Sequence, residues 1–492
     1  MNARDALAGL PASNRVLWIF GAWIALLCAL GNLPWQLDNY DQAKQAFVSY
    51  EIAAGGNPFF QHTPRGQIAT KPPLAGWISL PVYWLTGWWQ LAWRLPGYLA
   101  AVALAVLLVR RGALLWPGPG PVLVLCAFGL NMLTPRLATL VRTDMLLALW
   151  ITICGLLIFD KARTGEPWKA SERWIFFLAM LAALLTKGPV IYAFLLPGMG
   201  LYAWLAPRGR KAAVWSGWWT WLLPLLVFLG WGIAGLATRP EFYQQIVVEE
   251  FFSRFDQDLK AHERRQPFWF YFPHLLHKFL PWSLLLVALP AFSKNVRRAV
   301  REHPELLWLA CWALGGLILM TLVPSKRVDR IYPVVPPFCL LLVGMAGACQ
   351  CGARIRAWCG AAMLAAAAVW TSYFAAVVAI GFADGYHLLA RFGRKADLVA
   401  EAAGISAIDV ISGDDEALVI YAGETETLHH NRAVRRWNNG ESDALLLPAR
   451  RLVEDRISER VELPPPALDS GEVLGGERYL LFLRMKDGAE HR

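Results

Sequence analysis

The sequence has little charge for its length. Only 17% of its 492 residues are charged, whereas 56% are hydrophobic, and the mean hydropathy is +0.38. A soluble enzyme carries more charge on its surface, so this composition excludes a soluble protein. Apolar runs long enough to cross a bilayer, which takes roughly 17–25 residues, recur between residues 16 and 382. We therefore predict a polytopic α-helical membrane protein.

Three further features are scarce or missing. All eight cysteines lie between Cys28 and Cys359, so we expect no disulfide framework in the tail. Cys349, Cys351 and Cys359 are close in sequence, but we interpret them as small buried residues at a helix end and not as a metal site. Phosphate-binding loops and dinucleotide fingerprints are missing, which argues against a soluble nucleotide donor. The first apolar run lacks a small-residue cleavage site, so we expect a retained first helix with a cytoplasmic N-terminus.

The net charge of +10 reflects membrane orientation rather than nucleic-acid binding, because the basic residues gather in short loops between apolar runs. Placing these loops in the cytoplasm puts the intervening loops and the tail outside. The basic clusters lie at residues 110–111, 161–169, 208–211, 294–301 and 354–356. The opening loop, residues 35–73, is then outside, so only one of the runs 74–89 and 95–109 can cross fully. The run 74–89 is short for a crossing, which leaves about eleven to thirteen transmembrane helices.

The tail, residues 385–492, has a different composition. Short apolar runs alternate there with polar, helix-like pieces, which predicts a soluble α/β domain after a membrane domain of residues 1–384. His429 and His430 lack a third ligand at a suitable spacing for a metal site. The apolar runs are residues 409–411, 417–421, 444–447 and 479–483.

Polar residues converge on the outer face in this topology. Ionisable groups are costly at membrane depth and therefore indicate function, and Lys187 interrupts two apolar runs. The simpler alternatives are that Lys187 reaches the membrane interface and that the loop charges are only solvated. Cations bind phosphate, and a carboxylate can act as a general base. This combination suits transfer of a sugar from a polyprenyl phosphate, with an aspartate that deprotonates the acceptor.

Short motifs recur in order along most of the membrane region, including the second outer loop at residues 238–270. The motif residues are Asp41, Lys44, Glu51, Gly56, His62 and Lys71 in the first loop, then Arg142, Asp144, Lys187, Glu250, Arg254, His262, Lys326, Arg327 and Tyr332. Together these motifs resemble those of the GT-C glycosyltransferases. The resemblance is greatest to the branch of the aminoarabinose transferases of lipid A, and it extends more distantly to protein O-mannosyltransferases.

The resemblance implies a GT-C fold in the bacterial inner membrane, with the active site and the tail in the periplasm. It implies Asp41 as the catalytic carboxylate and Asp144 as its catalytic partner. The expected ligands are a polyprenyl-phosphate sugar donor, a lipid or protein acceptor and membrane lipids, without nucleic acid. The substrate-binding residues would be Lys44, His62, Lys71, Arg142, Lys187, Glu250, Arg254, His262, Lys326, Arg327 and Tyr332.

The first loop departs from the family pattern at Gln42, Lys44 and Gln45, where the family commonly has Glu, Arg and an aromatic residue. A sugar or acceptor different from those of the aminoarabinose enzymes is therefore plausible. A divalent cation could bind between Asp41 and Asp144, but the missing acid at Gln42 argues against an obligatory metal. A transporter or flippase of a lipid-linked anion is the main alternative, and a structural assembly subunit is a weaker one. Against transport stand the long first loop, the outer tail and the lack of an obvious internal repeat.

Overall fold

The computed structural model describes residues 14–37, 40–207, 211–251, 266–349, 352–411, 416–471 and 477–484. The chain divides into two compact units. The helical unit consists of Met1–Asn32, Thr70–Ala75 and Arg94–Ala375, and the loop–tail unit consists of Leu33–Ala69, Gly76–Trp93 and Ala376–Arg492. Residues 35–69 of the first loop thus group with the tail, and residues 70–73 with the helical unit, whereas we expected the whole loop in a membrane domain of residues 1–384.

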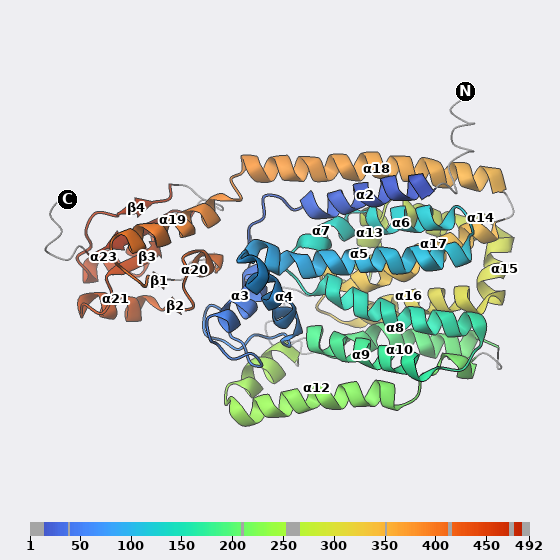
Figure 1. Ribbon diagram of the computed structural model, residues 1–492, viewed down its shortest axis with the longest axis horizontal. Helices are drawn as coiled ribbons and strands as arrows, with labels where there is room; N and C mark the ends of the chain where they lie inside the picture. The colour runs from blue at the N-terminus through green and yellow to red at the C-terminus, as the bar shows by residue number, and fades with distance from the viewer. Residues whose placement is uncertain are drawn as a thin grey trace. The chain divides into compact units, whose positions relative to one another are not determined.

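The helical unit is a bundle of long apolar helices (Figure 1). Six helices in the described part of the chain are long and apolar enough to cross a membrane, and the bent pairs α6 with α7 and α13 with α14 raise that number to eight. The helices are α2 (Asn14–Leu30), α5 (Trp89–Leu115), α6 (Gly120–Gly129), α7 (Leu133–Thr139), α8 (Asp144–Thr164), α9 (Ala170–Lys187), α10 (Val190–Leu205), η1 (Ala212–Val214), α12 (Trp219–Thr238), η2 (Tyr243–Phe251), α13 (Tyr271–Lys278), α14 (Trp282–Phe292), α15 (Lys294–Glu302), α16 (Pro304–Leu322), η5 (Val328–Val334), α17 (Val335–Ala348) and α18 (Gly352–Ala383).

Length and composition thus support six to eight spans, fewer than the eleven to thirteen expected. The difference arises in three helices that lie at predicted crossings. α2 and α10 are apolar but have only 17 and 16 residues, and α9 carries three charges, Glu172, Arg173 and Lys187, among its 18 residues. The helix α4 (Leu74–Thr86) has 13 residues, so it is too short to cross, as the sequence predicted.

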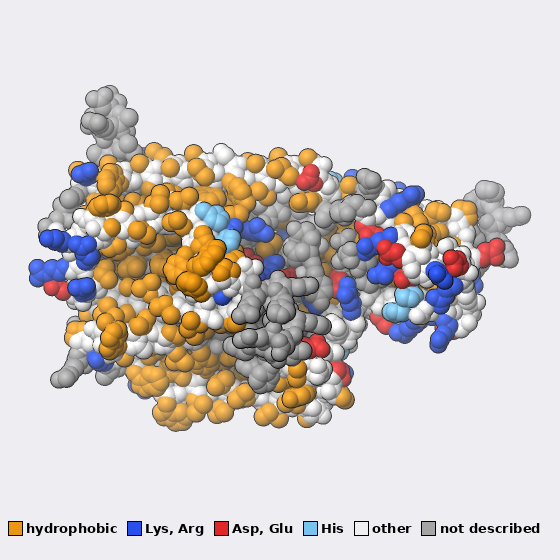
Figure 2. Space-filling view, turned by 180° about the vertical axis from the view of Figure 1, so that it is seen from behind, with side chains coloured by type: hydrophobic (Ala, Val, Ile, Leu, Met, Phe, Trp, Pro, Cys, Tyr) orange, Lys and Arg blue, Asp and Glu red, His pale blue; other side chains and the backbone are white. Residues whose placement is uncertain are grey.

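Many charges of the helical unit lie at its two ends. The helices α5 and α8 end, and α15 and α18 begin, at one end of the bundle, which brings four of the five basic clusters together there (Figure 1). In Figure 2, Lys and Arg side chains gather at this end, next to an extensive apolar surface. We call it the basic end. The helix ends that carry Asp144 and Lys187 lie at the opposite end, which we call the site end.

Close helix packing holds the bundle together where α10 meets α16. A Cβ atom on Gly198 would lie 2.7 Å from the Cα atom of Trp312, so a side chain has no room at this crossing. The indole of Trp312 fills the space beside Gly155 of α8, and Trp308 donates a hydrogen bond of 2.9 Å to the Gly155 carbonyl. Small residues therefore let three helices approach closely, as is usual inside membranes.

The loop–tail unit joins the first-loop helices to a mixed sheet. The sheet order is β2-β1-β3-β5-β4, in which β1 pairs in parallel with β2 and β3, and β5 pairs antiparallel with β3 and β4. This sheet confirms the predicted C-terminal α/β region. The elements are α3 (Tyr40–Ala53), α4, α19 (Leu388–Ala402), β1 (Asp409–Ile411), α20 (Ala417–Tyr421), β2 (Thr427–Leu428), α21 (His430–Asn438), β3 (Ala444–Pro448), α22 (Ala449–Glu454), α23 (Ile457–Arg460), β4 (Leu468–Asp469) and β5 (Tyr479–Leu483).

Candidate active site

The first part of the candidate site is an ion pair between two helix ends. α8 begins at Asp144 and α9 ends at Lys187, both at the site end of the helical unit. The Lys187 ammonium donates a hydrogen bond to Asp144 Oδ1, and the two side chains are only 18% and 7% exposed. The Asp144 carboxylate also lies at the positive end of the α8 dipole, which stabilises negative charge. Lys187 is therefore a partner of Asp144 and not merely an interfacial lysine.

A second ion pair lies on the same side of the unit. Arg142, two residues before Asp144, donates a hydrogen bond to Asp329 Oδ2, and Arg327 Nη2 lies 3.8 Å from that oxygen. Asp329 belongs to the short helix η5 and was not among the predicted site residues. The only signal for it in the sequence is its place between Arg327 and Arg330, where an acid can join two cations.

Lys71 completes this group, because its positive charge and that of Arg142 act on the Asp144 carboxylate. We use the name cation cluster for Lys71, Arg142, Lys187 and Arg327 with the carboxylates of Asp144 and Asp329. The group thus gathers four cations and two carboxylates at a partly buried position. Lysine and arginine bind phosphate by charge-assisted hydrogen bonds.

The segment that carries Arg327 is fixed by its neighbours. Lys326 Nζ donates a hydrogen bond of 3.0 Å to the Gln266 carbonyl, and burial lowers the pKa of this lysine. Arg330 Nη1 donates to the Ser325 carbonyl at 2.8 Å. The Tyr332 hydroxyl is fully buried, 2.9 Å from Thr134 Oγ1. The geometry thus gives Lys326 and Tyr332 positions that support η5, whereas Arg327 faces Asp329.

In the loop–tail unit, Asp41 lies in the first turn of α3, as the sequence predicted, and Lys44 follows one turn later. The positive charge of Lys44 acts on Glu416, a buried carboxylate in the tail. The side chains of Gln42 and Gln45 are buried. The other first-loop aspartate, Asp38, lies outside the described residues.

His62 has a local partner in the loop. Its backbone N–H donates a 2.6 Å hydrogen bond to Glu51 Oε2, and its Nδ1 lies 2.7 Å from Glu51 Oε1. Gly56 leaves room for this carboxylate, since a Cβ there would lie 2.6 Å from Glu51 Cγ. The motif residues Glu51, Gly56 and His62 therefore form one clamp, which closes the loop after α3.

The loop is also fastened to the tail within the same unit. Arg65 Nε lies 2.8 Å from Glu416 Oε1, and the Thr427 N–H donates a 3.0 Å hydrogen bond to the Pro64 carbonyl. The Leu37 N–H donates to the Tyr421 hydroxyl at 2.8 Å. Burial raises the pKa of Glu416, and the charges of Arg65 and Lys44 oppose this rise. These partners lie hundreds of residues apart, so no local sequence pattern predicts them.

The remaining predicted residues come from the second outer loop. Glu250 lies near the end of η2, and its side chain is outside the described residues, as are Arg254 and His262 altogether. In the part of the chain that the structure describes, no three His, Cys, Asp or Glu side chains come together in a way that could hold a metal ion.

Solved structures with the same architecture are glycosyltransferases. The chain aligns with ArnT from Cupriavidus metallidurans bound to undecaprenyl phosphate with a TM-score of 0.69 and 16% identity, over 98% of this chain and 100% of that one. It aligns with the oligosaccharyltransferase of Archaeoglobus fulgidus, in complex with zinc and sulfate, with a TM-score of 0.53 and 12% identity, over 90% of this chain and 70% of that one. These alignments confirm the predicted GT-C fold.

Sequence relatives have the same name as the first of these structures. An undecaprenyl phosphate-alpha-4-amino-4-deoxy-L-arabinose arabinosyl transferase from Edwardsiella ictaluri is 27% identical over 64% of this chain and 56% of its own length. One from Sodalis glossinidius is 27% identical over 67% of this chain and 60% of its own length. The chain thus matches less than two thirds of the length of these relatives. No family model matches it.

Proposed function

We propose that this protein is an integral-membrane glycosyltransferase that moves a sugar from a polyprenyl-phosphate donor to an acceptor, with a lipid as the favoured acceptor class. The observation that carries the proposal is the cation cluster, which gathers lysine and arginine side chains suited to a phosphate at the site end of a membrane bundle. Its GT-C fold is that of an enzyme solved with undecaprenyl phosphate, and its curated relatives are named as aminoarabinose transferases.

The proposed reaction is a single displacement at the anomeric carbon. An acceptor oxygen attacks this carbon, and the bond between the carbon and the phosphate oxygen breaks with its electron pair on that oxygen. Asp41 takes the proton of the acceptor, and the linkage inverts. The leaving phosphate gains negative charge as the bond breaks, so the cations of the cluster stabilise the transition state more than the ground state.

Within this reaction we assign Asp144 a positioning role. Its carboxylate is already held by Lys187 and lies near Lys71 and Arg142, so it orients the lysines that face the donor phosphate. Asp329 has the same role toward Arg142 and Arg327. Glu250, Arg254 and His262 remain proposed substrate-binding residues of the second outer loop, and Lys44 remains one of the first loop.

The proposed location is the bacterial inner membrane, with the site end and the tail in the periplasm. The support for this orientation is the gathering of basic residues at the opposite end of the bundle, which is expected to face the cytoplasm. The buried Gln42, at a position where relatives commonly have an acid, supports a reaction without an obligatory metal.

The proposal is tested by mass spectrometry of lipid A, other envelope glycans and secreted proteins from cells with the wild-type chain, with Asp41→Asn or without the chain. We expect one class of molecule to lose a single sugar in the deletion and in Asp41→Asn, because the amide cannot take the acceptor proton. Asp384→Asn, at an exposed aspartate, is the matched control, and cells with this variant should carry the same sugar modification as cells with the wild-type chain. A folded Asp41→Asn protein with full activity would remove Asp41 from the mechanism.

A further inference from the structure

Two cations lie close together where α7 meets α13 on the side of the helical unit. The Met132 N–H, at the N-terminal cap of α7, donates a 3.0 Å hydrogen bond to the carbonyl of Lys278, the last residue of α13. Arg136 follows Met132 by one helical turn, and its positive charge acts on Lys278. We call Lys278 and Arg136 the lateral cation pair. Figure 2 shows histidine and basic side chains beside an apolar patch on this unit.

The lateral cation pair has hydrogen-bond donors to spare. Lys278 Nζ donates to Met132 Sδ at 3.2 Å, and a thioether is a weak acceptor for one of the three ammonium donors. Among the described residues, Arg136 accepts a 2.8 Å hydrogen bond from Asn32 at its carbonyl, but its guanidinium donates none. The charge of Asp329 acts on Lys278, but this carboxylate already belongs to the cation cluster. The pair can therefore still donate to an anion.

An anion lowers the energetic cost of this arrangement. Like charges that lie close together repel each other, and cations are costly among membrane-facing apolar side chains. The surroundings are of that kind: Phe272 and Leu276, one turn apart on α13, are 53% and 48% exposed, and α13 and α14 together are apolar enough to cross a membrane. A phosphate accepts charge-assisted hydrogen bonds from both cations. The charged and apolar parts of this surface together fit an anionic lipid.

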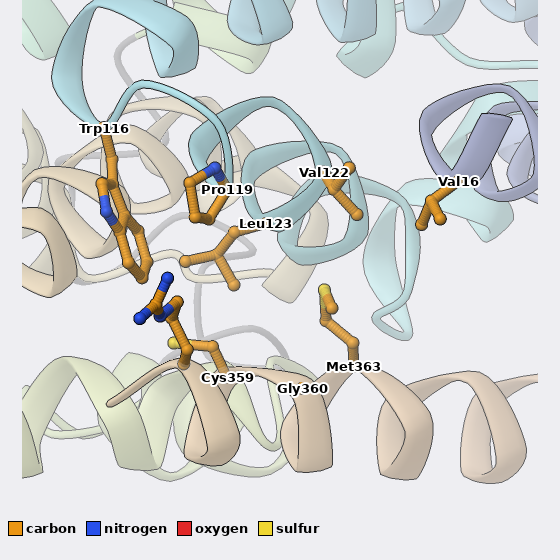
Figure 3. A pocket seen from close by; sticks show the side chains of 9 residues that line it. Val16, Trp116, Pro119, Val122, Leu123, Cys359, Gly360 and Met363 are labelled. Carbon is orange, nitrogen blue, oxygen red and sulfur yellow. The ribbon is translucent and has the colours of Figure 1, made fainter. Parts of the chain in front are cut away.

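The hollow at the basic end, by contrast, cannot hold a lipid. Figure 3 shows Pro119 and Leu123 on one side of it, facing Cys359 and Met363 of α18 on the other. Its volume of about 20 Å³ has room for a water molecule only. The lateral cation pair instead lies on open surface, since its arginine is exposed and its lysine is half-buried. A lipid can therefore reach the pair from the bilayer.

We propose that the lateral cation pair binds the phosphate of one anionic membrane lipid, whose acyl chain lies along Phe272 and Leu276. The lipid fastens α13 to α7, because both helices donate to the same phosphate. It is distinct from the sugar donor, whose phosphate the cation cluster would hold. The proposal therefore does not depend on the transfer reaction.

Native mass spectrometry of the purified protein in detergent tests this site, without any sugar donor. The protein is titrated with phosphatidylglycerol or with phosphatidylethanolamine of the same acyl chains. We expect one phosphatidylglycerol to stay bound and phosphatidylethanolamine to bind roughly tenfold more weakly, because only the first lipid has a net negative charge for the pair. Equal retention of the two lipids, or displacement of phosphatidylglycerol by an equal concentration of inorganic phosphate, would overturn the proposal.

The double variant Lys278→Met with Arg136→Gln locates the binding. It should weaken phosphatidylglycerol retention at least about tenfold, whereas the matched control Lys294→Met with Arg301→Gln, at exposed positions of α15, should leave retention unchanged. Circular dichroism checks that both variants fold. Unchanged retention in the folded Lys278→Met, Arg136→Gln protein would contradict the site.

A further variant separates this site from the cation cluster. Lys187→Met should retain phosphatidylglycerol like the wild type, because Lys187 belongs to the cluster and not to the lateral cation pair. A loss of retention in Lys187→Met alone would place the lipid in the cluster and overturn the proposal. Because no donor is present, either failure leaves the proposed glycosyl transfer untouched.

Discussion

At the scale of single residues, the pairing of Asp144 with Lys187 determines what each can do. A carboxylate that is held by an ammonium and lies near two more cations is a poor general base, since its negative charge is already stabilised. Asp41 lies in the first turn of α3, at the acid position of the first-loop motif. We therefore assign the base to Asp41 and the orienting role to Asp144.

Lys187→Met tests the phosphate-binding role of the cation cluster. Loss of a charge-assisted hydrogen bond to phosphate costs about 1.5–3 kcal/mol, so kcat/KM for the lipid-linked donor should fall roughly tenfold to a hundredfold. Lys169→Met, at the exposed opposite end of the same helix, is the control and should behave like the wild type. Steady-state kinetics in detergent measure both. Equal donor kinetics for the two variants would exclude Lys187 from donor binding.

At the scale of elements, the tail holds the first loop through Arg65–Glu416 and the hydrogen bond from Thr427 to Pro64. Burial raises the pKa of Glu416 above its usual 4.5. The folded chain therefore keeps this proton at a pH where the unfolded chain releases it. The contribution of Glu416 to stability is thus complete below pH 4.5 and is lost as the pH rises through the raised pKa.

We accordingly expect Glu416→Gln to reduce the fall in melting temperature between pH 4.5 and pH 7, because glutamine cannot ionise. Exposed Glu462→Gln should keep the wild-type pH dependence. Thermal unfolding in detergent, followed at several pH values, measures the slope of each protein. Parallel slopes for wild type and Glu416→Gln would show that this carboxylate does not have the raised pKa.

The contact between α10 and α16 gives a second prediction about elements. Gly198→Ala puts a methyl group 2.7 Å from the Trp312 Cα, and overpacking of this kind costs about 1–3 kcal/mol. Gly200→Ala in the same helix meets nothing within 4 Å and should be neutral or slightly stabilising, because alanine favours a helix by about 1 kcal/mol over glycine. Melting temperatures of the two variants test this. A Gly198→Ala protein as stable as Gly200→Ala would contradict the close packing.

The helices and strands also show how much of the fold the sequence predicts. Apolar runs located the helices, because hydropathy depends on local composition alone, and short apolar runs located β1, β3 and β5. The run 417–421 looks like a strand but forms the helix α20. The reason is topological: β1 pairs in parallel with β2, and a parallel neighbour needs a crossover connection, which α20 helps to provide. The composition of one apolar run does not show whether a crossover is required there.

The candidate site was only partly predictable for a similar reason. Asp144 and Lys187 were identified because charges that interrupt apolar runs are costly in a membrane. Asp329 and Glu416 were missed, since their partners Arg142 and Arg65 lie far away in the sequence and the pairing exists only in the folded chain. His62 stays a predicted substrate-binding residue, and its bonds to Glu51, which no local pattern predicts, also place it in the clamp of the loop.

At the scale of the whole molecule, the separation of charge along the helical unit links fold and function. In the proposed account, the basic residues at one end orient the protein in the membrane, and the cation cluster at the other end binds a lipid phosphate. A transporter could also use a cationic site, but it would release its substrate unchanged. The covalent product is therefore the property that separates the two functions.

The most direct measurement uses the purified protein in detergent micelles, where no sealed compartment exists. It is incubated with a labelled polyprenyl-phosphate sugar and with candidate lipid acceptors. We predict that the label moves covalently to an acceptor, that the wild-type chain and Asp384→Asn do this equally, and that Asp41→Asn does not. A donor that binds but keeps its label with every acceptor, although the same protein moves it across a sealed membrane, would contradict glycosyl transfer.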